Sequence, residues 1–396
     1  MPPRFGADEQ IIAALPYRGT QESGCGRACY DETIRLNPPM PIELLGKSVD
    51  ELRAALALLG EPAYRGTQIY RALYAERRFD FAAMTNLPAT LRTRLAAEAR
   101  FTLPRVVKRY HSADGAVRYL LALDSGAGPP TSIEAVFMPE AGRQTICIST
   151  QAGCPVNCHF CLTAQLGLVR NLTAGEIVGQ VLVPLEENNA RLAGRTNVVL
   201  MGQGEPLLNY EAVMQAVRLL LDAGGMALSA KHVTLSTSGI VPGIERLAQE
   251  KVRPKLAVSL NASSDEQRNA IMPINGKYPL EVLLEACRRY PLRAWERLTF
   301  EYVLLGGFND SPEDARRVAK LVANLHAKVN LIPWNPGELP YQSPEPARIE
   351  EFRRILADKG VLALVRRSRG QDVMAACGQL ALLETVPLHP APQVPA

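Results

Sequence analysis

From Gln144 onward, apolar runs of strand length alternate with amphipathic runs of helix length. This alternation favours a parallel sheet covered by helices, since each crossover between parallel strands usually needs a helix. Open doubly wound sheets and closed or partial barrels both fit the order. No GxGxxG motif follows a strand, which weakens a dinucleotide-binding fold. The strands fit 145–149, 197–201, 232–236, 255–259, 298–304, 328–332 and 361–365, and the helices fit 173–187, 209–223, 240–250, 280–289, 311–324 and 346–358.

A small helical module precedes the alternating region. Ser48 and Glu51 form a capping box, and leucines follow at helical spacing until Gly60 ends the helix. Further helices fit 64–76 and 87–99.

Extended runs then replace the helices. Residues 105–110 and 116–123 flank an Asp114-Gly115 turn, which predicts a β-hairpin, and 132–138 predicts another strand. The first 45 residues are rich in Pro, Gly and polar residues without a period, and their Cys25-x3-Cys29 pair fits chance. The predicted domains are a disordered extension (1–45), a basic helical accessory domain (46–104), a β-hairpin connector (105–139), a core (140–380) and a Pro-rich tail (381–396).

The positive charge is unevenly distributed. The chain has a net charge of +4, yet residues 46–110 hold 12 lysines and arginines against six acidic residues. Clustered positive charge attracts polyanions, of which nucleic acid is the usual one. A solvated helical surface would show the same composition, so both interpretations stay open.

The sequence predicts a cytoplasmic protein. It contains no apolar run of membrane-spanning length, and its N-terminus has no signal-peptide pattern. Thiols stay reduced in the cytoplasm, so a tight group among the eight cysteines indicates metal binding or catalysis rather than disulfides.

Three cysteines share one loop, with the spacing Cys154-x3-Cys158-x2-Cys161. Structural zinc usually takes four ligands, and the five histidines form no ligand pair; we interpret His159 as a packing residue. Three thiolates on one loop suit an iron–sulfur cube with one iron left open for a substrate or cofactor.

Small, polar or Gly/Pro-rich loops follow the other predicted strands. Because parallel strands end at one edge of a sheet or barrel, these loops predict a shared ligand pocket. They are "GQGEPLLN" (202–209), "STSG" (236–239), "SLNA" (259–262) and "PWNP" (333–336).

The cysteine spacing, with an aromatic residue before the last cysteine, resembles the radical S-adenosylmethionine superfamily, where the open iron binds the amino and carboxylate groups of the cofactor. "GEP" at 204–206 resembles its cofactor-amine motif. Further motifs along the chain are "MTNLP" (84–88), "IEAVFMPE" (133–140), "CISTQAGCPVNCHFC" (147–161), "RNLTAGEI" (170–177), "MGQGEPLLN" (201–209), "STSGIVP" (236–242), "IMPIN" (271–275), "VNLIPWNP" (329–336) and "AACGQL" (375–380). With these motifs in this order, residues 46–385 resemble the dual-specificity RNA methyltransferase family, which methylates carbon 2 of an adenine in large-subunit (23S) ribosomal RNA and in transfer RNA.

This resemblance implies a partial (β/α) TIM-type barrel and assigns roles to matching residues. Asn261 stands where the family usually has His, and Gln203 where it usually has Met. The implied residues are Cys154, Cys158 and Cys161 for a [4Fe-4S] cluster, Gly204, Glu205, Ser236, Ser259, Leu260, Asn261 and Asn335 for S-adenosylmethionine, Cys377 as the methylated cysteine, Cys147 as its disulfide partner and Glu134 as proton acceptor.

The resemblance also implies a mechanism that uses two S-adenosylmethionines per turnover. One methylates Cys377, and the other yields a 5′-deoxyadenosyl radical that takes hydrogen from the S-methyl group before the carbon adds to adenine. The implied partners are the two RNAs and an electron donor such as flavodoxin or ferredoxin, for a monomer without a membrane partner.

Three alternatives stay open at this point. The first is methylation of carbon 8 of the same adenine, and the second is an iron–sulfur electron carrier or RNA-binding scaffold. The third concerns single residues: Cys147 and Cys377 could be buried thiols, as we interpret Cys287, and Glu134 could be a carboxylate on a strand face.

Overall fold

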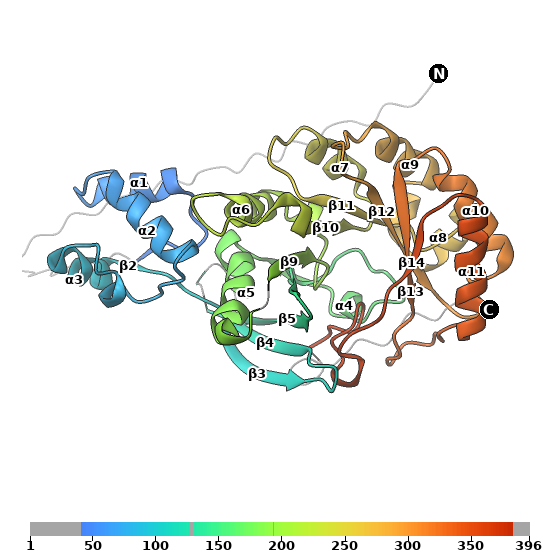
Figure 1. Ribbon diagram of the computed structural model, residues 1–396, viewed down its shortest axis with the longest axis horizontal. Coiled ribbons are helices and arrows are strands. Elements are labelled where there is room, and N and C mark those ends of the chain that lie inside the picture. Colours follow the sequence, from blue (N-terminus) through green and yellow to red (C-terminus); the bar gives the residue numbers. More distant parts are fainter. Residues whose placement is uncertain (1–40, 125, 127–129, 193, 383–396) are drawn as a thin grey trace, which may run out of the picture. The chain divides into compact units, whose positions relative to one another are not determined.

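A ten-stranded sheet organises the computed structural model, which describes residues 41–124, 126, 130–192 and 194–382 (Figure 1). The Cys25/Cys29 pair and residues 383–396 of the predicted tail lie outside these described residues. The strand order is β14-β13-β12-β11-β10-β9-β6-β5-β4-β3.

Seven of these strands are parallel and follow the predicted alternation. Among the described strands no pairing joins β14 to β6, so the parallel part is a barrel that does not close. The predicted partial barrel is therefore confirmed. The strands are β6 Arg143–Cys147, β9 Arg195–Leu200, β10 Val233–Thr237, β11 Lys255–Ser259, β12 Leu298–Leu304, β13 Ala327–Pro333 and β14 Ala363–Val365.

The predicted hairpin extends the same sheet. Strands β3 (Arg105–His111) and β4 (Val117–Leu123) pair antiparallel, and β5 (Thr131–Glu140) joins β4 to β6. Every residue of β4 is buried. The connector is thus continuous with the barrel sheet.

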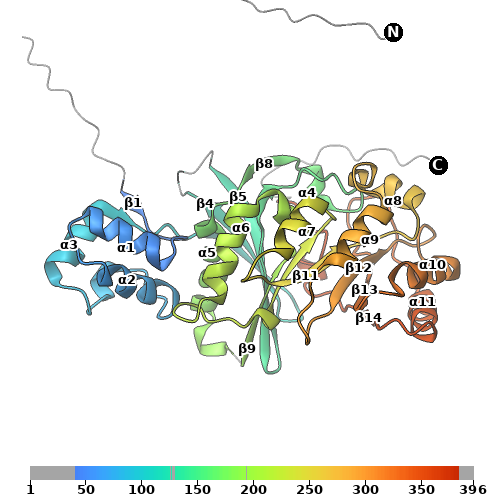
Figure 2. The same ribbon diagram turned by 90° about the horizontal axis from the view of Figure 1, so that it is seen from above.

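Helices cover the outer side of the parallel strands (Figures 1 and 2). Capping boxes at Thr173 and Ser311 fix the starts of two of them. Within the described residues, no helix is long and apolar enough to cross a membrane. The predicted helices are α5 Ala174–Glu187, α6 Tyr210–Leu221, α7 Val241–Ala248, α9 Leu280–Arg289, α10 Pro312–Val322 and α11 Pro346–Asp358.

Several short elements lack a periodic signal and were not predicted. They include the two-stranded sheet of β7 (Gln151–Gly153) and β8 (Leu168–Asn171), and the short helices α4 (Leu162–Gln165) and α8 (Asp265–Ile271). All four flank the strand-end loops. Periodicity needs more residues than these elements have.

The N-terminal module consists of α1 (Val49–Leu58), α2 (Tyr64–Tyr74) and α3 (Ala89–Glu98), and both hydrogen bonds of the Ser48–Glu51 capping box form. Strand β1 (Ile42–Glu43) pairs in parallel with β2 (Ala99–Arg100). The predicted extension therefore differs from the structure over its last residues, which pair with the module. Two-residue strands give no alternation to recognise.

Candidate functional site

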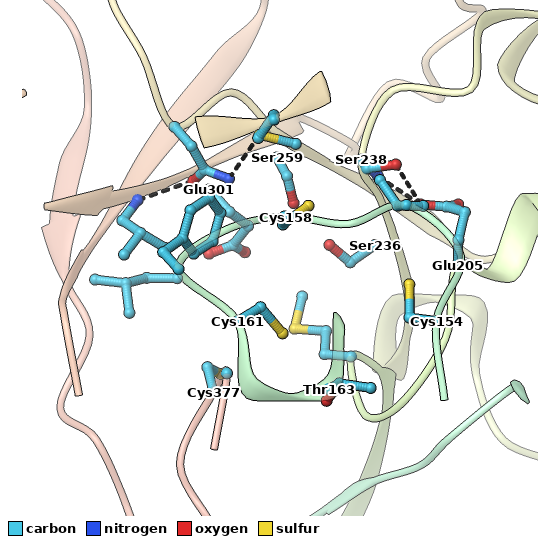
Figure 3. A pocket seen from close by; sticks show the side chains of 18 of the residues that line it. Cys154, Cys158, Cys161, Thr163, Glu205, Ser236, Ser238, Ser259, Glu301 and Cys377 are labelled. Atoms are coloured by element: carbon cyan, nitrogen blue, oxygen red, sulfur yellow. Dashed lines mark hydrogen bonds between the residues drawn. The ribbon is translucent and has the colours of Figure 1, made fainter. Parts of the chain in front are cut away.

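A cavity of about 170 Å³ lies at the carboxyl ends of the barrel strands (Figure 3). Ten of the 13 predicted site residues line it, although the first and last of them, Cys154 and Cys377, are 223 residues apart in the sequence. They are Cys154, Cys158, Cys161, Gly204, Glu205, Ser236, Ser259, Asn261, Asn335 and Cys377.

The cysteine loop has a fixed backbone. The Cys154 N–H donates to the Gly167 carbonyl (2.8 Å), and the Cys161 N–H donates to the Cys158 carbonyl (3.1 Å). Gly153 has φ +75°, and a Cβ there would lie 1.8 Å from the Gly167 oxygen, so only glycine fits. The His159 N–H donates to the Ile271 carbonyl (2.9 Å), which ties the loop to the end of α8.

The three thiols stand at separate points of the cavity wall, with Cys154 on the side of Glu205 and Cys161 on the side of Cys377 (Figure 3). Within the described residues, no three His, Cys, Asp or Glu side chains converge closely enough to hold a single metal ion. A cube of four irons binds each cysteine at a different corner, so separated thiols fit such a cluster.

Burial affects all three thiols in the same direction. It raises the pKa of Cys154 to about 12 and also raises the pKa values of Cys158 and Cys161. Thiols in such surroundings lose their protons when a metal binds, because a coordinating thiol is deprotonated.

The GEP loop is equally constrained. Gly204 has φ +99°, and a Cβ there would lie 2.7 Å from the Gln151 nitrogen. The Glu205 carboxylate accepts from the Ser238 N–H and hydroxyl (both 2.7 Å) and from the Leu207 N–H (3.0 Å). Burial raises the pKa of Glu205, while these hydrogen bonds act against the rise. A buried, oriented carboxylate at the wall suits a cationic group of a ligand.

Asn261 shows how the departure from His is accommodated. It adopts φ +58°, a conformation that Asn tolerates better than most residues. Its side-chain oxygen accepts from the Val303 N–H (2.9 Å) and its side-chain nitrogen contacts Met272 Sδ (3.4 Å). The neighbouring Leu260 is fully buried and does not line the cavity.

Gln203 is less well accommodated. It is fully buried, and its two side-chain amide atoms have no hydrogen-bond partner among the described residues. The Met that the family usually has at this position would bury no amide there.

The segment that carries Cys377 is held beside the cysteine loop. Asn335 Nδ2 donates to the Cys377 carbonyl (3.0 Å), and the Leu162 N–H donates to the Gly378 carbonyl (2.8 Å). Thr163 Oγ1 donates to the Leu380 carbonyl (2.6 Å). These bonds place Cys377 on the cavity wall next to Cys161 (Figure 3).

Cys147 lies outside the first cavity, in the wall of a second cavity of about 900 Å³. The two cavities share eight lining residues, including Met201, Arg366 and Cys377. Burial and, to a lesser extent, the Cys377 thiol raise the pKa of Cys147 to about 12, although the Arg366 guanidinium opposes this rise. Cys147 and Cys377 are both free thiols. The structure thus brings the two predicted thiols together at one junction.

Glu134 lines neither cavity. It is buried, accepts from Arg118 and from the Leu382 N–H (3.2 Å), and lies beneath the segment after Cys377. Burial raises the pKa of Glu134, and Arg118 opposes that rise.

Sequence reasoning missed two arginines. Arg366 contacts Glu301 (3.6 Å) and Met201 Sδ (3.5 Å) at the junction of the cavities. Arg268 is fully buried and donates to the carbonyls of Leu260 (3.1 Å), Ser238 (2.7 Å) and Ser259 (3.1 Å), so it ties two strand-end loops together. Arg366 directly follows the predicted strand 361–365, so the rule that strand-end residues line the pocket could have found it. No motif or strand end in the sequence marks Arg268.

Comparison with known proteins agrees with this geometry. Residues 148–321 match the model of the radical SAM superfamily, and residues 42–101 match that of the ribosomal RNA large subunit methyltransferase N-terminal domain. The chain is 49% identical to the probable dual-specificity RNA methyltransferase RlmN of Koribacter versatilis, over 83% of this chain and 99% of that protein. It is 47% identical to the dual-specificity RNA methyltransferase RlmN of Anaeromyxobacter dehalogenans, over 84% and 90%.

A solved structure of a radical SAM methyltransferase also matches the fold of this chain. The crystal structure of a radical SAM methyltransferase from Sphaerobacter thermophilus matches with a TM-score of 0.81 and 44% identity, over 86% of this chain and 99% of that one. The cavity, the cysteine loop and these matches together show that the chain belongs to the dual-specificity RNA methyltransferase RlmN family of the radical SAM superfamily.

Proposed function

We propose that this protein methylates carbon 2 of an adenine in large-subunit (23S) ribosomal RNA and in transfer RNA, using Cys377 as the methyl carrier. The observation that carries the proposal is the position of Cys377 at the junction of two cavities. A carrier thiol must reach the methyl donor on one side and the base on the other. Cys377 borders both spaces.

The cofactor roles rest on the walls of the smaller cavity. Cys154, Cys158 and Cys161 would hold one [4Fe-4S] cluster, with Gly204, Glu205, Ser236, Ser259, Leu260, Asn261 and Asn335 at or behind the S-adenosylmethionine site. When bound, these groups supply the methyl group, the electron and the radical chemistry that carbon 2 of adenine requires.

The remaining steps belong to side chains of this chain. Cys377 Sγ accepts the methyl group and presents its carbon to the base. The Cys147 thiolate then attacks Cys377 Sγ, so that a disulfide forms and the bond between Cys377 Sγ and the carbon breaks. The electron pair of that bond goes to the base, the carbon takes up a proton from solvent to become the methyl group, and the methylated RNA leaves. The proton lost from carbon 2 goes to Glu134 or to Cys147. Cys147 lines the larger cavity, whereas Glu134 lines neither cavity, and a Cys147 thiol formed in this way returns the proton to solvent before its thiolate attacks.

The basic module over 46–104 supports a second role, in RNA affinity but not in chemistry. We propose that it contacts the RNA backbone, that residues 105–139 connect it to the core over 140–380, and that the enzyme acts as a cytoplasmic monomer with flavodoxin or ferredoxin as electron donor.

Nucleoside mass spectrometry tests the reaction. RNA from a strain with this gene should contain 2-methyladenosine in 23S ribosomal RNA and transfer RNA, and RNA from a deletion strain should lack it. Formation of 8-methyladenosine would point to the sister reaction instead. A deletion strain with unchanged RNA would contradict the proposal and favour a scaffold.

Iron content tests the cofactor. Anaerobic reconstitution should give about four irons per chain and a brown chromophore. Cys158→Ala should lose both, and Cys287→Ala, the matched control in α9, should keep them.

A further inference from the structure

The inward-facing side chains of the barrel line one cavity near the starts of the strands and the other cavity near their ends. Every second residue of a strand faces the barrel interior, so the inward-facing residues can be followed along each strand. On β10 that row passes from Thr234 in the larger cavity to Ser236 in the smaller one, and on β11 it passes from Lys255 to Ser259. The larger cavity therefore opens at the starts of the strands, and the cofactor side lies about 7 to 13 Å further along.

The walls of the larger cavity are strongly cationic. Eight lysines and arginines and one histidine line it, against one acidic residue, Glu140. An ordinary barrel interior is filled by bulky aliphatic side chains. This one is a polar hollow of about 900 Å³.

Five of these cations form no ion pair within the described part of the chain, and we call them the cationic mouth. The other three arginines of the wall do have carboxylate partners: Arg143 with Glu140, Arg366 with Glu301, and Arg369 with Asp114. The mouth consists of Arg195, Lys231, Lys255, Lys328 and Arg367.

Two lysines of the cationic mouth lie at the starts of barrel strands. Lys255 and Lys328 are half-buried, on β11 and β13. Burial and the charge of Lys328 lower the pKa of Lys255, although Glu296 opposes this. Two ammonium groups held this close repel each other, so the arrangement costs stability unless an anion lies between them.

We propose that the cationic mouth is the entry site for the RNA, where Lys255 and Lys328 hold the phosphates that flank the target adenine. The inference rests on the proposed function and adds the face of the barrel from which the RNA arrives. A duplex cannot enter the barrel, so the nucleotide must leave its stack, and lysines that hold the adjacent phosphates would fix it there. The base then points along the lumen toward Cys377, on the side opposite the cofactor.

The spread of the cations distinguishes RNA from a small anion. A single phosphate needs two or three donors at one point. Here the cations come from four strands or strand ends and from the segment after β14, around a cavity of about 900 Å³. A spread set of cations matches a chain of phosphates.

The test compares Lys255→Gln/Lys328→Gln with Lys320→Gln/Lys359→Gln, an equal change of charge at two exposed lysines on or after the outer helices. The probe is a labelled RNA stem-loop with an adenine in its single-stranded loop. The mouth variant should bind about tenfold more weakly near physiological salt, and the slope of log K against log salt should fall by about 1.4 to 1.8, as expected for two lost phosphate contacts. The control should bind like the unmodified protein, and Lys255→Arg/Lys328→Arg should recover most of the affinity.

Methylation of Cys377 separates the possible failures, because it needs the cofactor and not RNA. The mouth variant should still acquire the methyl group on Cys377, as measured by peptide mass spectrometry. If the unmodified protein methylates RNA and the mouth variant binds RNA with unchanged affinity and slope, the inference is overturned alone. If the unmodified protein methylates no RNA, the proposed function fails and the inference fails with it.

Discussion

Two regions of the molecule carry surplus positive charge, and the charges face different surroundings. In residues 46–110, at least eight of the 12 cationic side chains form ion pairs, several of them with acids outside that segment such as Glu43, Asp124 and Glu187. In the cationic mouth, all five side chains lack such a partner among the described residues.

The module's cations are largely neutralised by neighbouring carboxylates, whereas those of the mouth remain available to an anionic ligand. Exposed ion pairs contribute little stability, and their arginines can exchange a carboxylate for a phosphate at small gain. Unpaired cations in a hollow attract an anion with their whole field, because low-dielectric walls focus it. The mouth should therefore dominate RNA positioning, and the module should add a smaller, less specific share.

The largest effect on RNA methylation should come from Cys377, which lies at the inner end of the larger cavity. Cys377→Ala should abolish RNA methylation, because Cys147 lines only the larger cavity and Cys161 is assigned to the cluster, so neither thiol can replace the carrier, and it should leave RNA affinity and iron content unchanged. Radiolabel transfer from S-adenosylmethionine to RNA measures the activity. Methylation at an unchanged rate would show that the lumen is not the chemical path.

Arg366 is the innermost cation of the cavity, and its loss should have the next largest effect. Its guanidinium favours the thiolate of Cys147, whose pKa is about 12, so Arg366→Gln should raise that pKa further. Only the thiolate attacks, and at any pH below the pKa the thiolate fraction should fall about tenfold if the pKa rises by about one. Release of RNA from Cys377 should then slow by up to about tenfold, since a thiolate of higher pKa is also the stronger nucleophile.

The pH dependence supplies the check on Arg366. Because the group must lose a proton and its pKa lies above the working range, the release rate should increase with pH in both proteins. The covalent RNA–protein adduct, followed on a denaturing gel, should accumulate in Arg366→Gln and clear faster as the pH rises. Equal adduct levels in both proteins would mean that Arg366 does not act on the thiols.

The module should respond more weakly than the mouth. Arg71→Gln/Arg78→Gln removes two cations that both contact Glu76, and stem-loop affinity should fall by no more than about threefold. A loss equal to that of the mouth variant would break the comparison and make the module the main RNA contact.

Sequence reasoning reached the elements and the first cavity, and the physical reason is periodicity. The barrel strands are short apolar runs that alternate with amphipathic helices, and α9 and α11 were predicted to the residue although neither has a side-chain N-cap hydrogen bond. The strand-end rule gathered Ser236, Ser259 and Asn335 before any geometry was known. Cys377, Cys147 and Glu134 required the resemblance, since nothing local distinguishes them from packing residues. The mouth could not be predicted, because Arg195, Lys255 and Lys328 are separated in sequence and become one site only when their strands lie side by side.

The smallest effect should come from breaking the ion pair between Asp114 and Arg369, a cation of the cavity wall that is paired like those of the module. Asp114, in the turn of the β3–β4 hairpin, accepts from Arg369 (2.8 Å) and from the Gly370 N–H (2.9 Å), and so fastens the segment that leads to Cys377. Burial alone would raise the pKa of Asp114, but hydrogen bonds from Ala116, Gly370 and Arg369 lower it to about 2. A depressed carboxyl pKa stabilises the fold above the unfolded value near 4, and this contribution is lost as the pH falls toward 2. Asp114→Asn should thus lower the melting temperature by only a few degrees at neutral pH, and the difference from the unmodified protein should shrink in acid. A difference that grows in acid would show that the carboxylate is not what holds the segment.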